Sequence, residues 1–310
     1  MSEKISGNIA ASVRQRLLNL ARKDQRPFNE LLQYYAMERF LYRLSQSSHA
    51  ERFILKGALM LIAWRSPVSR STMDIDLLGR TSNNEADIIS QIHDILAVEV
   101  PPDGLVFDPD SIQAERITED ADYEGIRIRF RGMLDSARVN MQIDIGFGDI
   151  VFPEPEESDL PAILDLPVPR LLCYSRESAI AEKFEAMVRL RELNSRMKDF
   201  YDIWLLSRQF DLEGEKLAEA IRLTFNHRGT TLSDEIVAFT KEFIEAKESQ
   251  WKAFIKKLKQ DHVPPSFADI VATVNAFLGP IASALSAGAT APTRWVAPGP
   301  WRSKTLDRKR

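Results

Sequence analysis

Hydrophobic residues recur at helical spacing near the start of the chain. One such stretch covers residues 10–22, and another covers residues 28–44, where Pro27 sets the start of the second helix. After them, Ser48-x-x-Glu51 is typical of a helix N-terminus, whereas Phe53-Ile54-Leu55 is equally typical of a strand. We therefore expect two amphipathic helices, followed by an element whose type the pattern leaves open.

Alternation of apolar and polar residues predicts a sheet in the middle of the chain. Residues 126–133 and 138–145 alternate in this way on either side of a short polar turn, which predicts a β-hairpin. A shorter run is Met73-Asp74-Ile75-Asp76-Leu77, and a helix is expected over residues 85–98. A proline-rich boundary at residues 152–169 then precedes a pattern that is helical from about residue 176 to residue 285.

These elements predict an α+β fold of two domains and a tail. The length of 310 residues suits about two domains. We expect residues 1–168 to form a domain in which a small mixed or antiparallel sheet is flanked by helices, the N-terminal helices included. Residues 169–287 are expected to form a helical domain, and residues 288–310 a tail rich in proline, glycine and basic residues.

Composition favours an intracellular globular protein. The hydrophobic content of 44% is ordinary, and a single cysteine, Cys173, allows no intramolecular disulfide and is expected to be buried. The polar N-terminus lacks a signal-peptide core, and no apolar run approaches the roughly 18 residues of a membrane span. We therefore expect a cytoplasmic monomer with no membrane contact.

Charge is distributed unevenly along the chain. An acidic segment, residues 81–166, holds 20 acidic and only 5 basic residues, whereas residues 1–46 hold 8 basic and 4 acidic ones. Basic clusters occur at Lys252, Lys256, Lys257 and Lys259 and in the last nine residues. Such segregation can orient a polyanion such as RNA, although each cluster taken alone could equally be a solvated surface.

The two carboxylates of Met73-Asp74-Ile75-Asp76-Leu77 are the main candidates for chemistry. In a strand, Asp74 and Asp76 share one face, and two such anions at close range need a cation. Asp144 lies on the polar face of the second hairpin strand and would join them if the two strands pair. Three carboxylates can hold Mg²⁺, or Mn²⁺, for phosphoryl or nucleotidyl transfer, whereas an isolated Asp-x-Asp is usually only solvated.

Other nucleotide-binding and metal-binding patterns are missing from the sequence. There is no Gly-x-x-x-x-Gly-Lys-Ser/Thr loop, and Gly146-Phe147-Gly148 lacks the third glycine of a dinucleotide-binding fingerprint. The histidines are scattered without the spacing of metal ligands. These patterns therefore give no support to a P-loop enzyme, a dinucleotide-binding enzyme or a histidine-ligated metal site.

Several motifs together resemble a known family. Leu55-Lys56-Gly57-Ala58, then residues 72–76, then Asp144 resemble the DNA polymerase beta-like nucleotidyltransferase superfamily. Residues 181–186 and 196–202 resemble the third and fourth motifs of the AbiEii family, the toxins of bacterial type IV toxin–antitoxin and phage-defence systems. The match begins at the first helix, where residues 13–22 are similar to the leader helix of that family, and runs to about Leu206.

The resemblance implies roles for residues that lie in these motifs. Asp74, Asp76 and Asp144 would bind metal and act in catalysis, together with Lys183, Asp199 and Asp202. Lys56, Gly57, Ala58 and Lys183 would contact the nucleotide, and Thr72 would lie beside the triphosphate if the Asp-x-Asp strand extends back to it. Ala58 departs from the Gly or Ser usual after the first glycine, so backbone amides, the following helix N-terminus and Lys56 must bind more of the phosphate.

The downstream residues also have ordinary explanations. Lys183 could be a surface lysine paired with Glu182 or Glu185, and Asp202 could form a surface ion pair with Lys198. The sequence does not choose between Asp199 and Asp202 as the essential acid.

By this resemblance, the chain would be a metal-dependent nucleotidyltransferase toxin. It would move a nucleoside monophosphate from an NTP onto an RNA acceptor, the 3′ end of tRNA being favoured, release pyrophosphate and block translation. A cognate antitoxin would be its protein partner. From the charge pattern, and not from the resemblance, we expect the lysines at positions 252, 256, 257 and 259 to bind RNA. Two alternatives remain: a nucleotidyltransferase for small molecules of the antibiotic type, and a non-catalytic nucleotide-binding interaction module.

Overall fold

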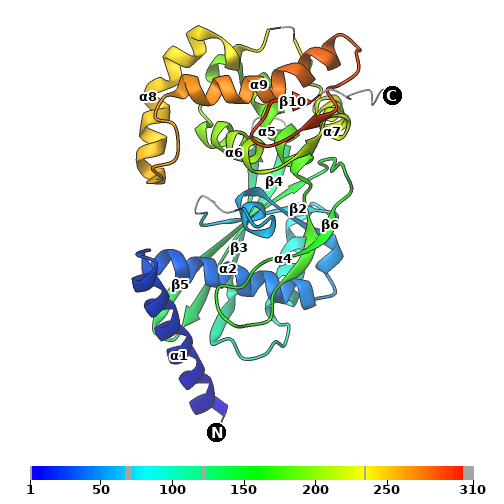
Figure 1. The fold of residues 1–310 in the computed structure, drawn as a ribbon. Helices are drawn as coiled ribbons and strands as arrows, with labels where there is room; N and C mark the ends of the chain where they lie inside the picture. Colours follow the sequence, from blue (N-terminus) through cyan, green and yellow to red (C-terminus); the bar gives the residue numbers. More distant parts are fainter. Residues whose placement is uncertain (1, 67–71, 120–122, 234, 303–310) are drawn as a thin grey trace, which may run out of the picture. The chain divides into compact units, whose positions relative to one another are not determined.

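The chain folds into two compact units (Figure 1). The computed structural model describes residues 2–66, 72–119, 123–233 and 235–302. Unit 1 comprises Met1–Asp149 and Pro155–Tyr174, and unit 2 comprises Ile150–Glu154 and Ser175–Arg310.

Unit 1 is built on a seven-stranded mixed sheet in the order β3-β4-β5-β2-β1-β7-β6. The strands are β1 Phe53–Lys56, β2 Ile75–Gly79, β3 Leu105–Glu119, β4 Tyr123–Leu134, β5 Ala137–Phe147, β6 Glu156–Asp159 and β7 Arg170–Cys173. The pairs β2–β5 and β1–β7 are parallel, and the other neighbours are antiparallel. The predicted hairpin is confirmed as β4 and β5, joined across the two-residue turn Asp135-Ser136.

The helices of unit 1 are α1 Ser2–Lys23, α2 Phe28–Gln46, α3 Met60–Ala63 and α4 Glu85–Leu96. The expected helices over residues 10–22, 28–44 and 85–98 are therefore confirmed, with Pro27 at the N-cap of α2. The strand interpretation of Phe53-Ile54-Leu55 is confirmed, since these residues belong to β1. The expected helix start at Ser48 gives only the short 3-10 helix Ala50–Arg52, whose N-terminus no side chain caps.

Alternation along the central strands separates a core face from a polar face. Ile75 and Leu77 of β2, together with Ile143 and Ile145 of β5, are at most 1% exposed, and α2 packs against β5. Asp76 and Asp144 alternate with these residues and lie on the opposite face. The hydrophobic pattern that forms the core therefore also sets the direction of the candidate catalytic residues.

Strand β3 was not expected from the sequence. Its 15 residues include Pro109, which cannot donate a ladder hydrogen bond and interrupts the alternation. The register between β3 and β4 shifts between Asp108 and Gln113, so the ladder accommodates the proline in an irregularity. A pattern search for strict alternation therefore misses this strand.

Unit 2 is mostly helical, as expected. Its helices are α5 Arg176–Leu190, α6 Met197–Gln209, α7 Gly214–His227, α8 Lys241–Leu258 and α9 Phe267–Ser286, with 3-10 helices η3 Arg191–Leu193 and η4 Val237–Phe239. Ser175 begins α5, because its hydroxyl accepts a hydrogen bond from the Ser178 N–H. A three-stranded sheet completes the unit, formed by β8 Leu212–Glu213, β9 Arg294–Trp295 and β10 Trp301–Arg302.

Helix α9 corrects one expectation from the sequence. By length and composition, its 20 residues are apolar enough to cross a membrane, although no such run was expected. Asp269 and Asn275 break the helix into shorter apolar runs, so a search for one long apolar run misses it. They barely lower the mean hydropathy of the whole helix. Residues such as Ile270, Val274 and Phe277 are fully buried in unit 2, which is the pattern of a core helix in a globular unit.

The expected tail is also partly folded. Trp295 is 2% exposed, and its indole N–H donates to the Ser207 carbonyl. Its ring lies 4.9 Å from that of Phe277, and Trp301 stacks on the same phenylalanine at 5.7 Å. Residues 288–302 therefore contribute to the core of unit 2, since two tryptophans offset the flexibility of the Pro/Gly-rich stretch.

We predict that Trp295→Ala lowers the free energy of unfolding by about 3–5 kcal/mol, because it removes a buried indole from the core. The neighbouring Arg294→Ala is the control and should cost less than about 1 kcal/mol, since that side chain is 60% exposed and only forms a surface ion pair. Urea unfolding measures both. Equal stability of Trp295→Ala and the unchanged protein would mean that this segment is a loose tail.

Candidate active site

Four neighbouring strands place charged residues in one row across the polar face of the sheet. The register pairs Lys56 with Asp76, Asp76 with Asp144, and Asp144 with Arg127. We call these four residues the charged row. Because adjacent strands lie about 4.8 Å apart, the predicted juxtaposition of Asp144 with the Asp-x-Asp motif is confirmed.

Asp144 is bound by the guanidinium of Arg127. The Nε and Nη2 atoms of Arg127 lie 2.7 Å from Oδ1 and Oδ2 of Asp144, which is a bidentate ion pair. Hydrogen bonding to Asp144 raises the pKa of the Arg127 guanidinium above its ordinary value, with further contributions from the charges of Asp144, Glu115 and Asp74. Arg127 therefore remains a cation that neutralises the negative charge of Asp144.

Asp76 packs directly over the turn that follows β1. Gly57 has φ of +74°, a backbone conformation that side chains rarely adopt. A Cβ atom built on this glycine would lie 1.8 Å from Oδ2 of Asp76. Gly57 is thus needed both for the backbone of the turn and for the space that the Asp76 carboxylate occupies.

Lys56 extends from the end of β1 to a carboxylate that the sequence did not single out. Its Nζ lies 2.9 Å from Oδ2 of Asp149 and 5.7 Å from the ring centroid of Tyr174. The side chains of Lys56 and Asp149 are only 13% and 7% exposed. A phosphate that binds Lys56 would therefore have to compete with Asp149.

Asp74 lies outside the strand that carries Asp76. Strand β2 begins at Ile75, so the expected strand does not include Met73 and Asp74, and the condition that it extend back to Thr72 is not met. The Thr72 hydroxyl instead donates to Oδ1 of Asp74 at 2.5 Å. Gln33 of α2 donates to the carbonyls of Met73 and Asn140, both at 3.1 Å, and thereby fixes this bend against β5.

The three predicted metal ligands do not form a closed cage. Among the described residues, no three Asp, Glu, His or Cys side chains are grouped so that they could hold a metal ion. Asp74 itself is in the bend before β2 and not in the ladder. Asp76 and Asp144 still offer hard oxygen donors from adjacent strands, which suit Mg²⁺ or Mn²⁺. The Arg127 guanidinium occupies the oxygens of Asp144 that a metal ion would use. The two carboxylates therefore fit a divalent ion only if that ion displaces Arg127.

In unit 2, the structure brings Lys183, Asp199 and Asp202 together. Nζ of Lys183 lies 3.3 Å from Oδ1 of Asp199 and 3.0 Å from Oδ2 of Asp202, and both aspartates are 3% exposed. Oδ2 of Asp199 also forms an ion pair with Nε of Arg196, at 3.1 Å. Lys183 is therefore no surface lysine paired only with its helical neighbours, and both acids hold its amine.

The four lysines predicted to bind RNA lie at the end of α8. Lys252, Lys256 and Lys257 are exposed on the helix, and Lys259 follows it with a left-handed backbone. Lys252 forms an ion pair with Glu248 at 3.2 Å. Phe254, Ile255 and Leu258 of the same helix are half-buried against the rest of unit 2, so the lysines remain accessible.

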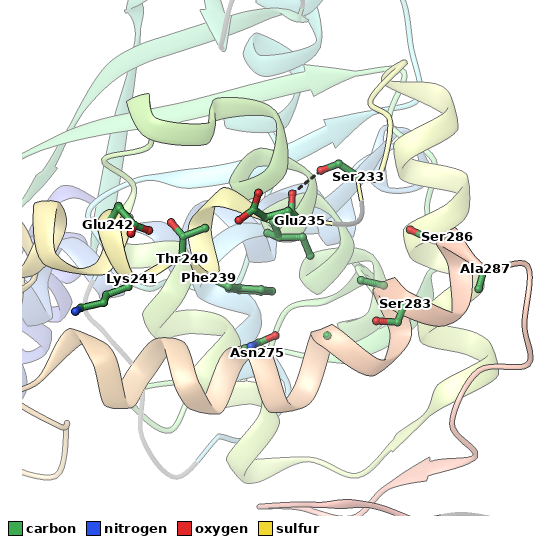
Figure 2. A pocket seen from close by; sticks show the side chains of 13 residues that line it. Ser233, Glu235, Phe239, Thr240, Lys241, Glu242, Asn275, Ser283, Ser286 and Ala287 are labelled. Atoms are coloured by element: carbon green, nitrogen blue, oxygen red, sulfur yellow. Dashed lines mark hydrogen bonds between the residues drawn. The ribbon is translucent and has the colours of Figure 1, made fainter.

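A separate cavity of about 750 Å³ lies in unit 2, between Ser233 and residues 235–242 on one side and helix α9 on the other (Figure 2). Phe239 and Thr240 line it from one side, and Asn275 and Ser283 line it from α9. None of the predicted site residues contributes to its wall. This cavity is therefore not the place where the predicted chemistry gathers.

Sequence reasoning missed Arg127, Asp149 and Gln33. The two-residue turn Asp135-Ser136 fixes the hairpin register, so counting back from it would have paired Arg127 with Asp144. Asp149 and Gln33 reach their partners over long sequence separations, and no local pattern in the sequence indicates either contact.

Comparison with known proteins gives one family. The family described as "Nucleotidyl transferase AbiEii toxin, Type IV TA system" matches residues 39–273. No curated protein matches the chain significantly. Among solved structures, JHP933 from Helicobacter pylori is similar, with a TM-score of 0.44, 11% identity and coverage of 84% of this chain and 94% of that one. A second H. pylori protein, described as a candidate nucleotidyltransferase, has a TM-score of 0.44 and 12% identity, and the match covers 84% of this chain and 97% of that one.

We predict that Gly57→Ala destabilises the protein more than Gly229→Ala. Both glycines have positive φ, but a Cβ on Gly229 meets no atom within 4 Å. Each substitution should cost about 1–2 kcal/mol for the left-handed backbone, and Gly57→Ala a further 1–3 kcal/mol, roughly, for the overlap with Asp76. Urea unfolding measures the difference.

The double variant Gly57→Ala/Asp76→Ala tests the cause. If the Asp76 carboxylate is what the new methyl group meets, removing it should recover most of the additional loss. Equal losses at the two glycines, or no recovery in the double variant, would contradict this packing of Asp76.

Proposed function

Because this chain belongs to the AbiEii family of nucleotidyl transferase toxins of type IV toxin–antitoxin systems, we propose that it transfers a nucleoside monophosphate from an NTP to RNA. The 3′ end of tRNA is the acceptor we favour, since blocking it stops translation and accounts for toxicity. The observation that carries the proposal is the charged row, in which Asp76 and Asp144 stand side by side between two cations.

Transfer of the nucleotide requires one bond to form as another breaks. The acceptor hydroxyl oxygen forms a bond to the α-phosphorus, while the bond from that phosphorus to the bridging oxygen breaks and pyrophosphate leaves. Asp144 positions the acceptor hydroxyl and takes its proton. Asp76 and Asp144 would hold Mg²⁺ or Mn²⁺, with Asp74 as a third ligand only if it approached them, and the bound ion would supply neutralisation of phosphate charge.

In unit 1, residues around the turn after β1 are proposed to bind the nucleotide. Lys56 exchanges Asp149 for phosphate oxygens, the backbone at Gly57 and Ala58 approaches the phosphates, and Thr72 stays beside Asp74. By the family motif, Lys183 of unit 2 is proposed to stabilise phosphate charge as a point charge. Both Asp199 and Asp202 orient its amine, since both carboxylates lie within ion-pair distance of it.

The partners follow from the family and from the surface charge. Lys252, Lys256, Lys257 and Lys259 bind the RNA backbone, and a cognate antitoxin restrains the toxin. We propose that the protein acts as a cytoplasmic monomer in phage defence. Incubation with each labelled NTP, Mg²⁺ and total RNA tests the activity: labelled tRNA supports the proposal, whereas a labelled small molecule or no product supports one of the other two functions.

We predict that Asp76→Ala or Asp74→Ala lowers the transfer rate at least about a thousandfold, which corresponds to about 4 kcal/mol of transition-state stabilisation. Asp87→Ala removes an exposed carboxylate of α4 and is the control, with activity close to that of the unchanged protein. Single-turnover transfer of labelled nucleotide measures the rate, and urea unfolding confirms the fold. Activity within about tenfold of the unchanged protein in either variant would remove the proposed role of these carboxylates.

We predict that replacing Lys256, Lys257 and Lys259 together by Gln weakens RNA binding and its dependence on salt. If four to six phosphates are contacted, log affinity falls against log salt with a slope of about −3 to −5, and the variant should flatten it by about two to three. The Michaelis constant for RNA should rise, while that for NTP stays unchanged. A variant of Lys241 and Lys247, earlier on α8, is the control; an unchanged slope in the triple variant would make the cluster a solvated surface.

A further inference from the structure

Unit 1 has a cavity of its own, which adjoins Asp74. Its volume is about 460 Å³, and its wall comes from the start of α2, the bend before β2, and strands β4 and β5. Asp74 and Met73 belong to this wall, as do Arg129 of β4 and Arg138 of β5. Because β1 and β5 flank β2 on opposite sides, the cavity lies on the side of Asp74 away from the Gly57 turn.

The charges around the cavity single out Arg138. Of the basic residues in the acidic segment, Arg116, Arg127, Arg129 and Arg131 each form an ion pair with a carboxylate. Arg138 is exposed and has no ion-pair partner in the part of the chain that the structure describes. An arginine that faces a cavity and has no carboxylate partner is suited to bind an anion such as a phosphodiester.

The other walls are suited to a nucleoside. Met73 is 54% exposed, an unusual position for a large apolar side chain, and Leu32 belongs to the same wall. Asn29 and Gln142 bring amide groups that can donate and accept hydrogen bonds at a base edge. Asn29 also belongs to the first turn of α2, where the helix dipole favours negative charge.

We propose that this cavity binds the terminal nucleotide of the acceptor RNA strand. Arg138 binds the phosphodiester, Met73 contacts the base, and the strand end lies next to Asp74, opposite to the side on which the triphosphate lies. The inference rests on the proposed function and names the subsite for its acceptor. A cationic small-molecule acceptor fits less well, because Arg138 would repel it.

Binding of a short RNA tests the cavity without any need for activity. The probe is a fluorescein-labelled single-stranded RNA hexanucleotide with a free 3′ hydroxyl, and fluorescence anisotropy gives its affinity without NTP. Arg138→Gln should weaken binding about tenfold and flatten the salt slope by about 0.7, as expected for one lost single-strand phosphate contact. Arg138→Lys should retain much of the affinity. The control is Arg131→Gln, on the same hairpin but outside the cavity wall, which should change affinity less than about twofold.

Steady-state transfer kinetics then separate the two proposals. Arg138→Gln should raise the Michaelis constant for the RNA acceptor and leave that for NTP unchanged. Equal losses in the Arg138 and Arg131 variants, no measurable binding of the hexanucleotide, or an effect on NTP alone would overturn the acceptor subsite. If the unchanged protein transfers nucleotide and Arg138→Gln has the same Michaelis constant for RNA, only the acceptor subsite is contradicted. If the hexanucleotide binds through Arg138 but no NTP is ever transferred, the proposed function fails instead.

Discussion

Two carboxylates on adjacent strands repel each other, and the polar face of unit 1 is organised around that repulsion. Asp76 and Asp144 lie directly opposite in a parallel ladder, at a separation of about 5 Å that the strand spacing imposes. Two negative charges at such a distance are unfavourable by a few kcal/mol at the dielectric of a protein surface. Arg127 offsets the charge of Asp144, and Lys56 follows Asp76 on the other side of the charged row. Cations on both sides therefore stabilise an arrangement that would otherwise strain the sheet.

The same ion pairs suggest how substrates are accepted. Lys56 is held by Asp149, and Lys183 is held by Asp199 and Asp202, so each amine is oriented before any phosphate arrives. A phosphate that replaces one of these carboxylates exchanges one charge-assisted contact for another, which limits the desolvation cost of binding. Arg127 would similarly give up Asp144 if a divalent cation bound there. The resting protein is thus stabilised by contacts of the kind that the proposed reaction would need.

Much of this arrangement could be predicted from the sequence, because it depends on local patterns. Alternation located the hairpin and the face of Asp144, and Pro27 located α2. Arg127 was also within reach, since a two-residue turn fixes which residues pair. The remaining features depend on contacts over long sequence separations. Strand β2 begins only at Ile75, and Gln33 holds the preceding bend against β5, so no local pattern could show that Asp74 leaves the ladder.

We propose that Asp76 and Asp144 form the nucleotide and metal site of this protein. A crystal structure with Mn²⁺ and a non-hydrolysable NTP analogue tests it most directly, since the anomalous signal of manganese locates the ion without reference to any assumed role. We expect a manganese peak within coordination distance of Asp76 and Asp144, with Arg127 displaced from Asp144 and triphosphate oxygens beside the Gly57 turn. Manganese and nucleotide bound elsewhere, with the Arg127–Asp144 pair intact, would contradict this account.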